Sequence, residues 1–270
     1  MKNSIAVLAF LVTGFASAQK SQVFEIKVQP QKKYTLESTT LNNMNMDVPG
    51  QGPMNIMQDT KSPMTITASK ADASGKIPAE IKYGDVVVKQ MVGGQNQEQK
   101  SPVSNMTVTG SFDADGKFTM TDVKGENVTE EVKGTLNIAL ESGLKHINFP
   151  KTALKVGDTF DDTTPLKIPL GQLGTMNATI KTNYKLTKIE NGIGYFDTVQ
   201  TMTLDGDMKD INMKATGSGA GKVEVSIADK YLKKNSTTMD MDMEIEAAPG
   251  MMLTVKSKAT NSTVATVSKI

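Results

Sequence analysis

The sequence has no cysteine, no tryptophan and a single histidine, and all of its basic residues are lysine. Without cysteine there are no disulfides, so the stability of the fold depends on its core. One histidine and no thiolate exclude the usual zinc and soft-metal sites. Arginine is the preferred bidentate clamp for phosphate, so its absence argues against nucleic acid as a partner. We therefore expect no cofactor, no metal site and no nucleic-acid partner.

Strong net charge and long apolar runs are also missing. The formal net charge is +1, with 22% charged and 38% hydrophobic residues among 270. This composition is typical of a globular chain and gives no general attraction to anionic membranes or nucleic acid. The length suits one large β domain. We assign residues 19–270 to a single β-rich domain, with two lobes joined near residues 145–160 as an alternative.

The N-terminus carries the three parts of a secretory signal peptide. Lys2 supplies a positive charge, residues 5–15 form a short apolar run, and Ala16-Ser17-Ala18 is a small-x-small cleavage site. We predict that residues 1–18 are removed after Ala18. The protein would then be exported to the periplasm or the exterior as a soluble chain, without a transmembrane segment. The next residue is Gln19 rather than cysteine, so no lipid anchor is expected.

Most of the chain alternates between apolar and polar residues, the pattern of strands with one buried face. Asp113–Gly116 and Asn191-Gly192 are hairpin signals. We expect loops or breaks at residues 49–53, 93–102, 205–207, 217–221 and 249–250. The clearest alternating groups are Phe24, Ile26 and Val28; Met64, Ile66 and Ala68; Val223, Val225 and Ile227; and Met239, Met241, Met243 and Ile245.

Residues 127–144 have helical spacing instead, with Val132, Leu136 and Leu140 on one face. Asn127 with Glu130 fits a capping box, and Gly143 fits a C-terminal stop. An apolar stripe on a lone helix must be buried against the sheet. The predicted fold class is therefore mainly β (α+β): a large, curved, half-barrel-like antiparallel sheet with one amphipathic helix packed against it.

The segment from Phe149 to Phe160, FPKTALKVGDTF, follows this predicted helix. It resembles the central motif of an uncharacterised β-rich family of exported Bacteroidetes proteins, a domain of unknown function. In that family, too, the order is export signal, β-rich half, helix, motif and β-rich half. The resemblance implies a fold more than a function, because the family has no assigned activity. At a greater distance, the layout is similar to the LolA/LolB-like periplasmic carriers, which wrap a curved sheet around an apolar lumen.

Methionine is abundant, with 18 residues against 8 Phe and 5 Tyr. Three explanations are open. Methionine could replace other apolar residues in an ordinary core, could line an adaptable apolar groove, or could bind Cu(I) through Met-x-Met pairs at Met44 and Met46 and along residues 239–243. Alternating methionines on one strand are about 7 Å apart, which suits a single ion poorly.

We predict a non-enzymatic exported binding protein with a methionine-rich groove for a hydrophobic small molecule or lipid. The alternative is a structural or surface-interaction protein with a solid core. We interpret Asp240, Asp242 and Glu244 as a solvated face, Asp158 as a turn residue and His146 as structural, and we predict no catalytic residues. The candidate groove comprises Val132, Leu136, Leu140, Val223, Val225, Ile227, Met239, Met241, Met243 and Ile245.

Overall fold

The computed structural model describes residues 21–48, 50, 52–126, 128–144, 147–169, 175–208, 211–248 and 251–270. The predicted signal peptide, the 249–250 break and His146 lie outside these residues. The described residues form one helix, α1 (Glu130–Gly143), and the strands β1 (Lys32–Val48), β2 (Gly52–Ala68), β3 (Ile77–Tyr83), β4 (Val87–Val92), β5 (Gln95–Lys100), β6 (Thr107–Phe112), β7 (Phe118–Lys124), β8 (Thr159–Pro169), β9 (Thr175–Glu190), β10 (Ile193–Met208), β11 (Ile211–Ser226), β12 (Tyr231–Ala248) and β13 (Met251–Lys269).

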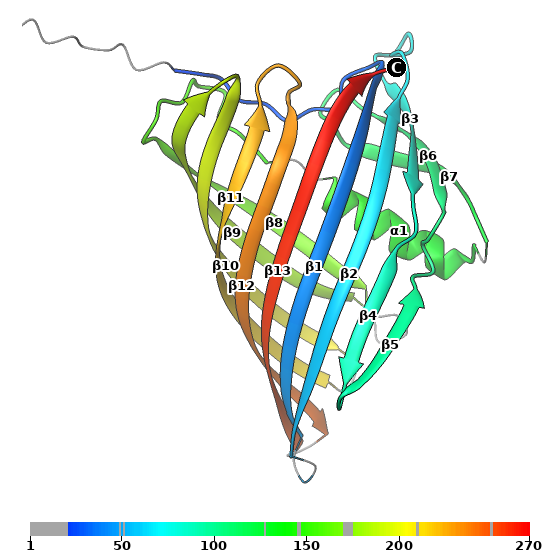
Figure 1. Cartoon of the computed structure of the whole chain (residues 1–270), viewed down its shortest axis with the longest axis vertical. Helices are drawn as coiled ribbons and strands as arrows, with labels where there is room; N and C mark the ends of the chain where they lie inside the picture. Colours follow the sequence, from blue (N-terminus) through cyan, green and yellow to red (C-terminus); the bar gives the residue numbers. More distant parts are fainter. Residues whose placement is uncertain are drawn as a thin grey trace, which may run out of the picture.

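All strands belong to one antiparallel sheet with the order β7-β6-β3-β2-β1-β13-β12-β11-β10-β9-β8, and the β4–β5 hairpin branches from β2. The first and last strands of this order do not pair, so the sheet is open. In Figure 1, β12, β13, β1 and β2 cross the front of the view while β8, β9 and β10 pass behind them, and the molecule narrows toward one end. The predicted fold class is confirmed.

The helix packs on the inner side of this sheet, which we call the concave face. Leu136, Leu140 and Leu144 are buried in one cluster with Tyr34 and Ile66 from β1 and β2. The helix begins after Thr129, whose hydroxyl accepts a hydrogen bond from the Val132 amide. Thr129 is therefore the N-cap in place of the predicted Asn127, which lies outside the described residues. It ends at Gly143, as predicted. Within the described residues, no helix has the length and hydropathy needed to cross a membrane.

The period-two pattern decides which face each side chain occupies. Met239 is buried, and Met241 and Met243 are half-buried, on the concave face of β12. Asp240 and Asp242 alternate with them and are exposed on the opposite, convex face. The same alternation continues through the paired strands β13, β1 and β2. The concave face is therefore continuous across strands that are distant in the sequence.

Two expected interruptions are strand instead, and a third is strand in part. Residues 205–207 lie inside β10, and residues 217–221 lie inside β11. Residues 93–102 form a Gly93-Gly94 turn and the strand β5. Met44 and Met46, which lie in polar sequence, are likewise strand residues, in β1. The Asp113–Gly116 and Asn191-Gly192 turns were predicted correctly, and both residues of the second have positive φ.

The glycines of β11 mark a sharp fold in the sheet. Gly217, Gly219 and Gly221 all lie on the concave face. A Cβ atom on Gly219 would lie 2.6 Å from the Thr238 carbonyl oxygen of β12. A Cβ on Gly221 would lie 2.8 Å from the Thr237 hydroxyl of β12 and 2.9 Å from the Thr198 hydroxyl of β10. The neighbouring strands close over these glycines, so the absence of side chains lets the sheet fold here.

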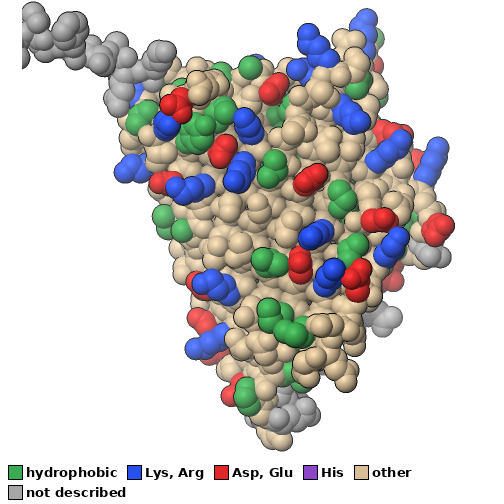
Figure 2. Space-filling view, viewed as in Figure 1, with side chains coloured by type: hydrophobic (Ala, Val, Ile, Leu, Met, Phe, Trp, Pro, Cys, Tyr) green, Lys and Arg blue, Asp and Glu red, His purple; other side chains and the backbone are tan. Residues whose placement is uncertain are grey.

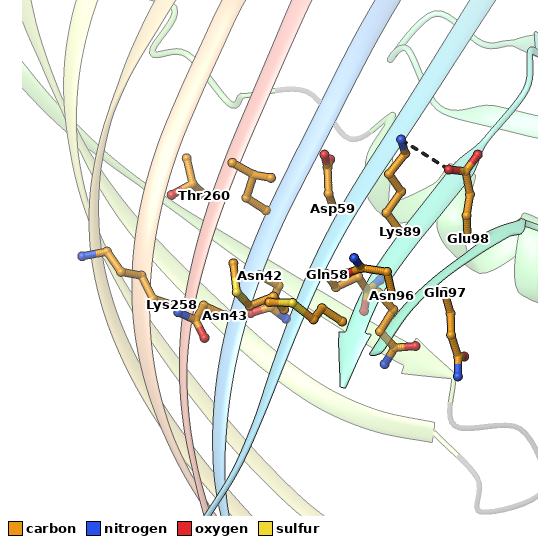
Figure 3. Close-up of a pocket in the computed structure, with 14 residues that line it drawn as sticks. Asn42, Asn43, Gln58, Asp59, Lys89, Asn96, Gln97, Glu98, Lys258 and Thr260 are labelled. Carbon is orange, nitrogen blue, oxygen red and sulfur yellow. Dashed lines mark ion pairs between the residues drawn. The ribbon is translucent and has the colours of Figure 1, made fainter. Parts of the chain in front are cut away.

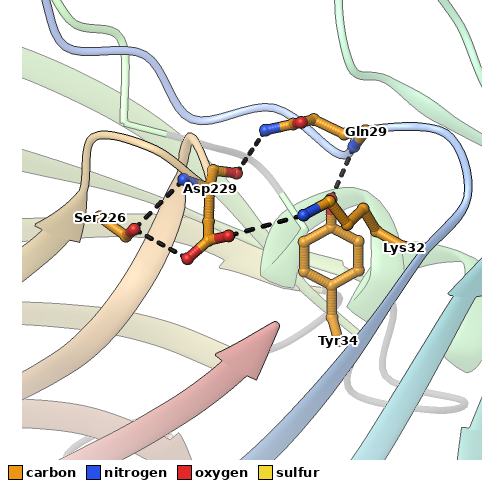
Figure 4. Close-up of polar contacts among 5 residues, drawn as sticks. All are labelled: Gln29, Lys32, Tyr34, Ser226 and Asp229. Carbon is orange, nitrogen blue, oxygen red and sulfur yellow. Dashed lines mark hydrogen bonds and ion pairs between the residues drawn. The ribbon is translucent and has the colours of Figure 1, made fainter. Parts of the chain in front are cut away.

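The segment before β1 crosses the wide end and joins the two halves of the sheet. Phe24 packs with the cluster of β9, β10 and β11, while Val28 packs with the cluster beneath α1. The Tyr34 hydroxyl accepts a hydrogen bond from the Gln29 amide, and the Gln29 side chain donates to the Asp229 carbonyl (Figure 4). Lys32 lies 3.7 Å from the Asp229 carboxylate. The two contacts with Asp229 connect sequence positions about 200 residues apart.

The glycine fold gives a direct stability prediction. Gly219→Val should lower the free energy of unfolding by about 1–3 kcal/mol, the usual cost of overpacking, because its Cβ meets the backbone of β12. Urea denaturation followed by circular dichroism measures the change. Ala220→Val is the control, since Ala220 is exposed on the convex face of the same strand. Equal losses in the two variants would contradict the role given to Gly219.

Candidate functional site

A cavity of about 340 Å³ lies between α1 and the concave face. Its apolar lining comes from the sheet, the helix, the segment before β1 and the segment after the helix. Its polar lining is uncharged and comes from β1, β2, β12 and β13. The lining residues are Ile26, Leu36, Ser38, Ser62, Met64, Tyr83, Leu140, Leu144, Ile147, Tyr231, Leu232, Asn235 and Thr263. Mostly apolar walls with a few polar groups are typical of small-molecule sites, and the volume is at the low end of their range.

From this cavity toward the narrow end, the concave face carries a band of neutral polar side chains. We call it the polar belt. Several of its members pair across neighbouring strands: Ser38 with Thr263 at 3.0 Å, Ser257 with Asn42 at 2.7 Å, and Gln200 with Thr182 at 3.1 Å. The belt consists of Ser38, Thr40, Asn42, Gln58, Thr60, Ser62, Thr182, Thr198, Gln200, Asn235, Thr237, Ser257, Asn261 and Thr263.

Some residues of the polar belt are exposed to solvent and others are buried. Asn261 is exposed although it lies on the concave face, so solvent reaches this part of the belt. Thr198 is 3% exposed, and its hydroxyl has no hydrogen-bond partner among the described residues. A buried hydroxyl without a partner costs stability, so such groups are rare in solid cores. The polar belt thus combines solvent-exposed and buried hydroxyl and amide groups.

Past the polar belt, the concave face becomes apolar again at what we call the methionine end. Ala178, Leu204 and Ala215 form a small buried cluster there, with Met213 and Met243 packed against it. Half-buried methionines come from strands of both walls. The methionine end comprises Met44, Met46, Met54, Ile56, Ala178, Met202, Leu204, Met213, Ala215, Met241, Met243, Ile245, Leu253 and Val255.

The residues of the predicted groove lie on the concave side but in separate places. Leu136 and Leu140 belong to the cluster beneath the helix, with Val132 packed against it. Val223 and Val225 belong to the second cluster, with Ile227 packed against that one. Met239, Met241, Met243 and Ile245 follow β12 toward the narrow end.

Among the predicted groove residues, Leu140 lines the cavity. The polar residues of the cavity wall are not among the predicted groove residues. Ser38, Ser62 and Thr263 are unremarkable in the sequence, and their strands are distant along the chain. Alternation does place each of them on the inward face of its strand, and this was the available signal.

The acidic residues of β12 lie on the convex face. Asp240, Asp242 and Glu244 are exposed, and Asp240 forms an ion pair with Lys258 at 3.8 Å. Asp242 is opposite Lys256 in the neighbouring strand. No cluster of three or more acidic or histidine side chains suited to a metal ion occurs among the described residues. The arrangement fits a solvated face with cross-strand charge pairs.

A second, more open hollow of about 640 Å³ lies on the convex face, over β1, β2, β13 and the β4–β5 hairpin (Figure 3). Its floor contains Leu41 and Met57, which are 50% and 44% exposed. Lys89 and Glu98 form an ion pair of 3.3 Å at its side, and one oxygen of Asp59 is buried without a partner in the described structure. An apolar molecule here would stay in contact with water, so the concave cavity is the better candidate site.

The segment after the helix has a structural role. Asp158 accepts a hydrogen bond from the Lys155 amide at 2.8 Å, and its own amide donates to the Lys155 carbonyl. Gly157 has φ of 100°, which glycine adopts without strain. Phe149 and Phe160 then pack with Phe196, so the turn returns the chain to the second cluster. These contacts support the interpretation of Asp158 as a turn residue.

No protein-family model matches this chain, and no curated protein matches it. A solved structure of lipid–protein interactions in lipovitellin is 12% identical with a TM-score of 0.45, covering 89% of this chain and 26% of that one. This chain thus spans about a quarter of the lipovitellin chain. An exported protein with a YmcC-like fold from Bacteroides fragilis is 11% identical with a TM-score of 0.23, covering 87% and 97%.

OccK7 from Pseudomonas aeruginosa is 7% identical with a TM-score of 0.28, covering 87% of this chain and 99% of that one. All three likenesses are weak and concern β-rich architecture alone. The resemblances to the Bacteroidetes family and to the LolA/LolB-like carriers therefore stay predictions.

Burial raises the pKa of Tyr83, beside the cavity, to about 12. In the unfolded chain this phenol ionises near pH 10, so above pH 10 the folded state retains a proton that the unfolded state loses. The stabilisation is complete below pH 10 and is lost as pH rises toward 12. Tyr83→Phe should therefore show a smaller fall in the free energy of unfolding over this range, by at most about 2–3 kcal/mol.

Urea titrations of both proteins at pH 9 and pH 11.5 measure this difference. Comparing the two proteins cancels the lysines, which titrate over the same range in each. Tyr195→Phe is the matched control, because Tyr195 is an outward-facing residue of β10 and lies beneath the Lys188 ammonium group. The prediction is wrong if the wild type and Tyr83→Phe lose stability in parallel.

Proposed function

We propose that this chain is an exported, non-enzymatic binding protein that holds a lipid-like molecule against the concave face of its sheet. One observation carries the proposal: along the inward-facing positions, an apolar wide end is followed by the polar belt and then by the apolar methionine end. A solid core would be mostly apolar, because buried polar groups cost free energy unless they are hydrogen-bonded. An amphipathic ligand matches alternating apolar and polar zones.

The apolar zones have the chemistry that an acyl or other hydrocarbon chain requires. Each methylene group moved from water to such a surface contributes about 0.8 kcal/mol. Methionine side chains are flexible and polarizable, so the half-buried Met44, Met46 and Met54 could adapt to different chain lengths. The cavity beneath Leu140 and Leu144 adds an already formed apolar wall.

The alternative is a structural or surface-interaction protein with a solid core. The cavity beside the helix and the exposed Asn261 on the concave face favour the binding protein. The Cu(I) alternative is disfavoured by spacing, because Met239, Met241 and Met243 are alternate residues of one extended strand. Their Cα atoms are about 7 Å apart, too far for convergent ligation without further donors.

Binding can be tested with an introduced fluorophore, because the chain contains no tryptophan. Met44→Trp places the single tryptophan on the concave face of β1, and Asn45→Trp places it on the convex face one residue later. We expect saturable quenching of Met44→Trp, and none of Asn45→Trp, by a monoacylglycerol with a brominated chain. Equal quenching of both variants, or quenching of neither by this lipid and by the corresponding brominated fatty acid, would refute binding on the concave face.

Filling the cavity should compete with this binding. Ser62→Phe adds a ring at a half-buried wall position, and we expect about tenfold weaker quenching affinity in the Met44→Trp background. Thr65→Phe is the control, since it adds the same ring on the opposite face of β2. Circular dichroism confirms that both fold. An unchanged affinity for Ser62→Phe would remove the cavity from the binding site.

A further inference from the structure

Charged side chains are almost entirely sorted to one face of the sheet. On strands β1, β2 and β9 to β13, the lysines and carboxylates occupy outward-facing positions, as for Glu37 and Lys61, and Asp197 and Lys222. Figure 2 shows basic and acidic side chains spread across the near, convex face. The inward-facing positions of the same strands carry apolar or neutral polar residues.

Few exceptions occur at the described inward-facing positions. Lys32 and Lys269 lie opposite each other at the wide rim, and Lys32 is paired with Asp229. Lys233 is the extra residue of the bulge in β12 and is exposed. Asp162 of β8 is buried, but the amide and side-chain nitrogens of Asn148 both donate to it. The polar belt itself contains only hydroxyl and amide side chains.

From this sorting we infer that the bound molecule has an uncharged, hydroxyl- or amide-bearing head, which lies at the polar belt with its apolar chain toward the methionine end. The inference rests on the proposed function. A carboxylate or phosphate bound at the polar belt would lose its hydration without gaining an ion pair, because no lysine lies in the belt. A neutral hydroxylated head group can instead form hydrogen bonds with the hydroxyl and amide side chains of the belt. Ser62, Asn235 and Thr263 are the nearest such groups around the cavity.

The position of the polar belt also fits the geometry of an amphipathic molecule. Six inward-facing residues of β1 follow one another from Leu36 through Ser38, Thr40, Asn42 and Met44 to Met46. At about 3.3 Å per residue, this path is roughly 33 Å long. An elongated lipid can therefore lie along the strand, with its head beside the hydroxyls and its chain beside the methionines.

The test compares three lipids that share the same type of acyl chain and differ in the head group. Using Met44→Trp, quenching is titrated with three brominated single-chain lipids below their micelle concentrations: a monoacylglycerol, the free fatty acid, and the lysophosphatidylglycerol. We expect the uncharged monoacylglycerol to bind at least about tenfold more tightly than either anion. Equal or tighter binding of the anions would overturn the inference while leaving the proposed function intact. Failure of all three lipids to bind would instead refute the proposed function.

A charge placed in the polar belt gives a second, independent measurement. In the same Met44→Trp background, Ser62→Lys adds a cation beside the cavity, and we expect its preference for monoacylglycerol over the free acid to fall about tenfold or more. Thr65→Lys adds the same charge on the convex face and should keep the original preference. An unchanged preference in a folded Ser62→Lys variant counts against the inference. If that variant does not fold, the comparison of the three lipid head groups still tests the inference.

Discussion

The molecule depends on folding a single sheet against itself, and the glycines of β11 make that possible. At Gly219 and Gly221 the backbone and side chains of β10 and β12 come so close that a Cβ atom would collide. Without this fold, the front strands and the back strands could not face each other, and the inward side chains of both would be exposed. Three glycines in one strand weaken it locally, but they give the protein its interior.

At the wide end of the folded sheet the two walls are farthest apart, so other segments of the chain must fill the space between them. The helix fills one side of that space through Leu136, Leu140 and Leu144. Residues 147–160 and the segment before β1 fill the other side, where Phe24 packs against both Phe149 and Phe196. Nothing comparable is inserted at the polar belt among the described residues. The division of the interior therefore follows from where the chain supplies filling segments.

Much of this could be predicted from the sequence, because alternation directly encodes which face of a strand is buried. Met239 and Asp240 were placed on the correct faces in this way, and the helix was predicted from its own spacing. The incorrect predictions fall where the local amino-acid composition favours a different structure from the one that the fold imposes. The run from Gly217 to Gly221 predicts a break because glycine usually interrupts strands, yet here the lack of side chains is needed within a strand. The cavity could not be predicted, since it depends on strands that pair across about 200 residues, such as β1 with β13.

The same alternation explains why the polar belt is informative. A strand of seventeen residues such as β1 is longer than the filled core it meets, so its inward positions must change character along its length. If the remainder simply faced water, lysine and glutamate would be tolerated there, as they are on the convex face. Instead, the inward positions change to serine, threonine and asparagine and then return to methionine. Burial between the two walls disfavours charge at these positions, and the proposed neutral amphipathic molecule, lying along the strand, would require the same exclusion.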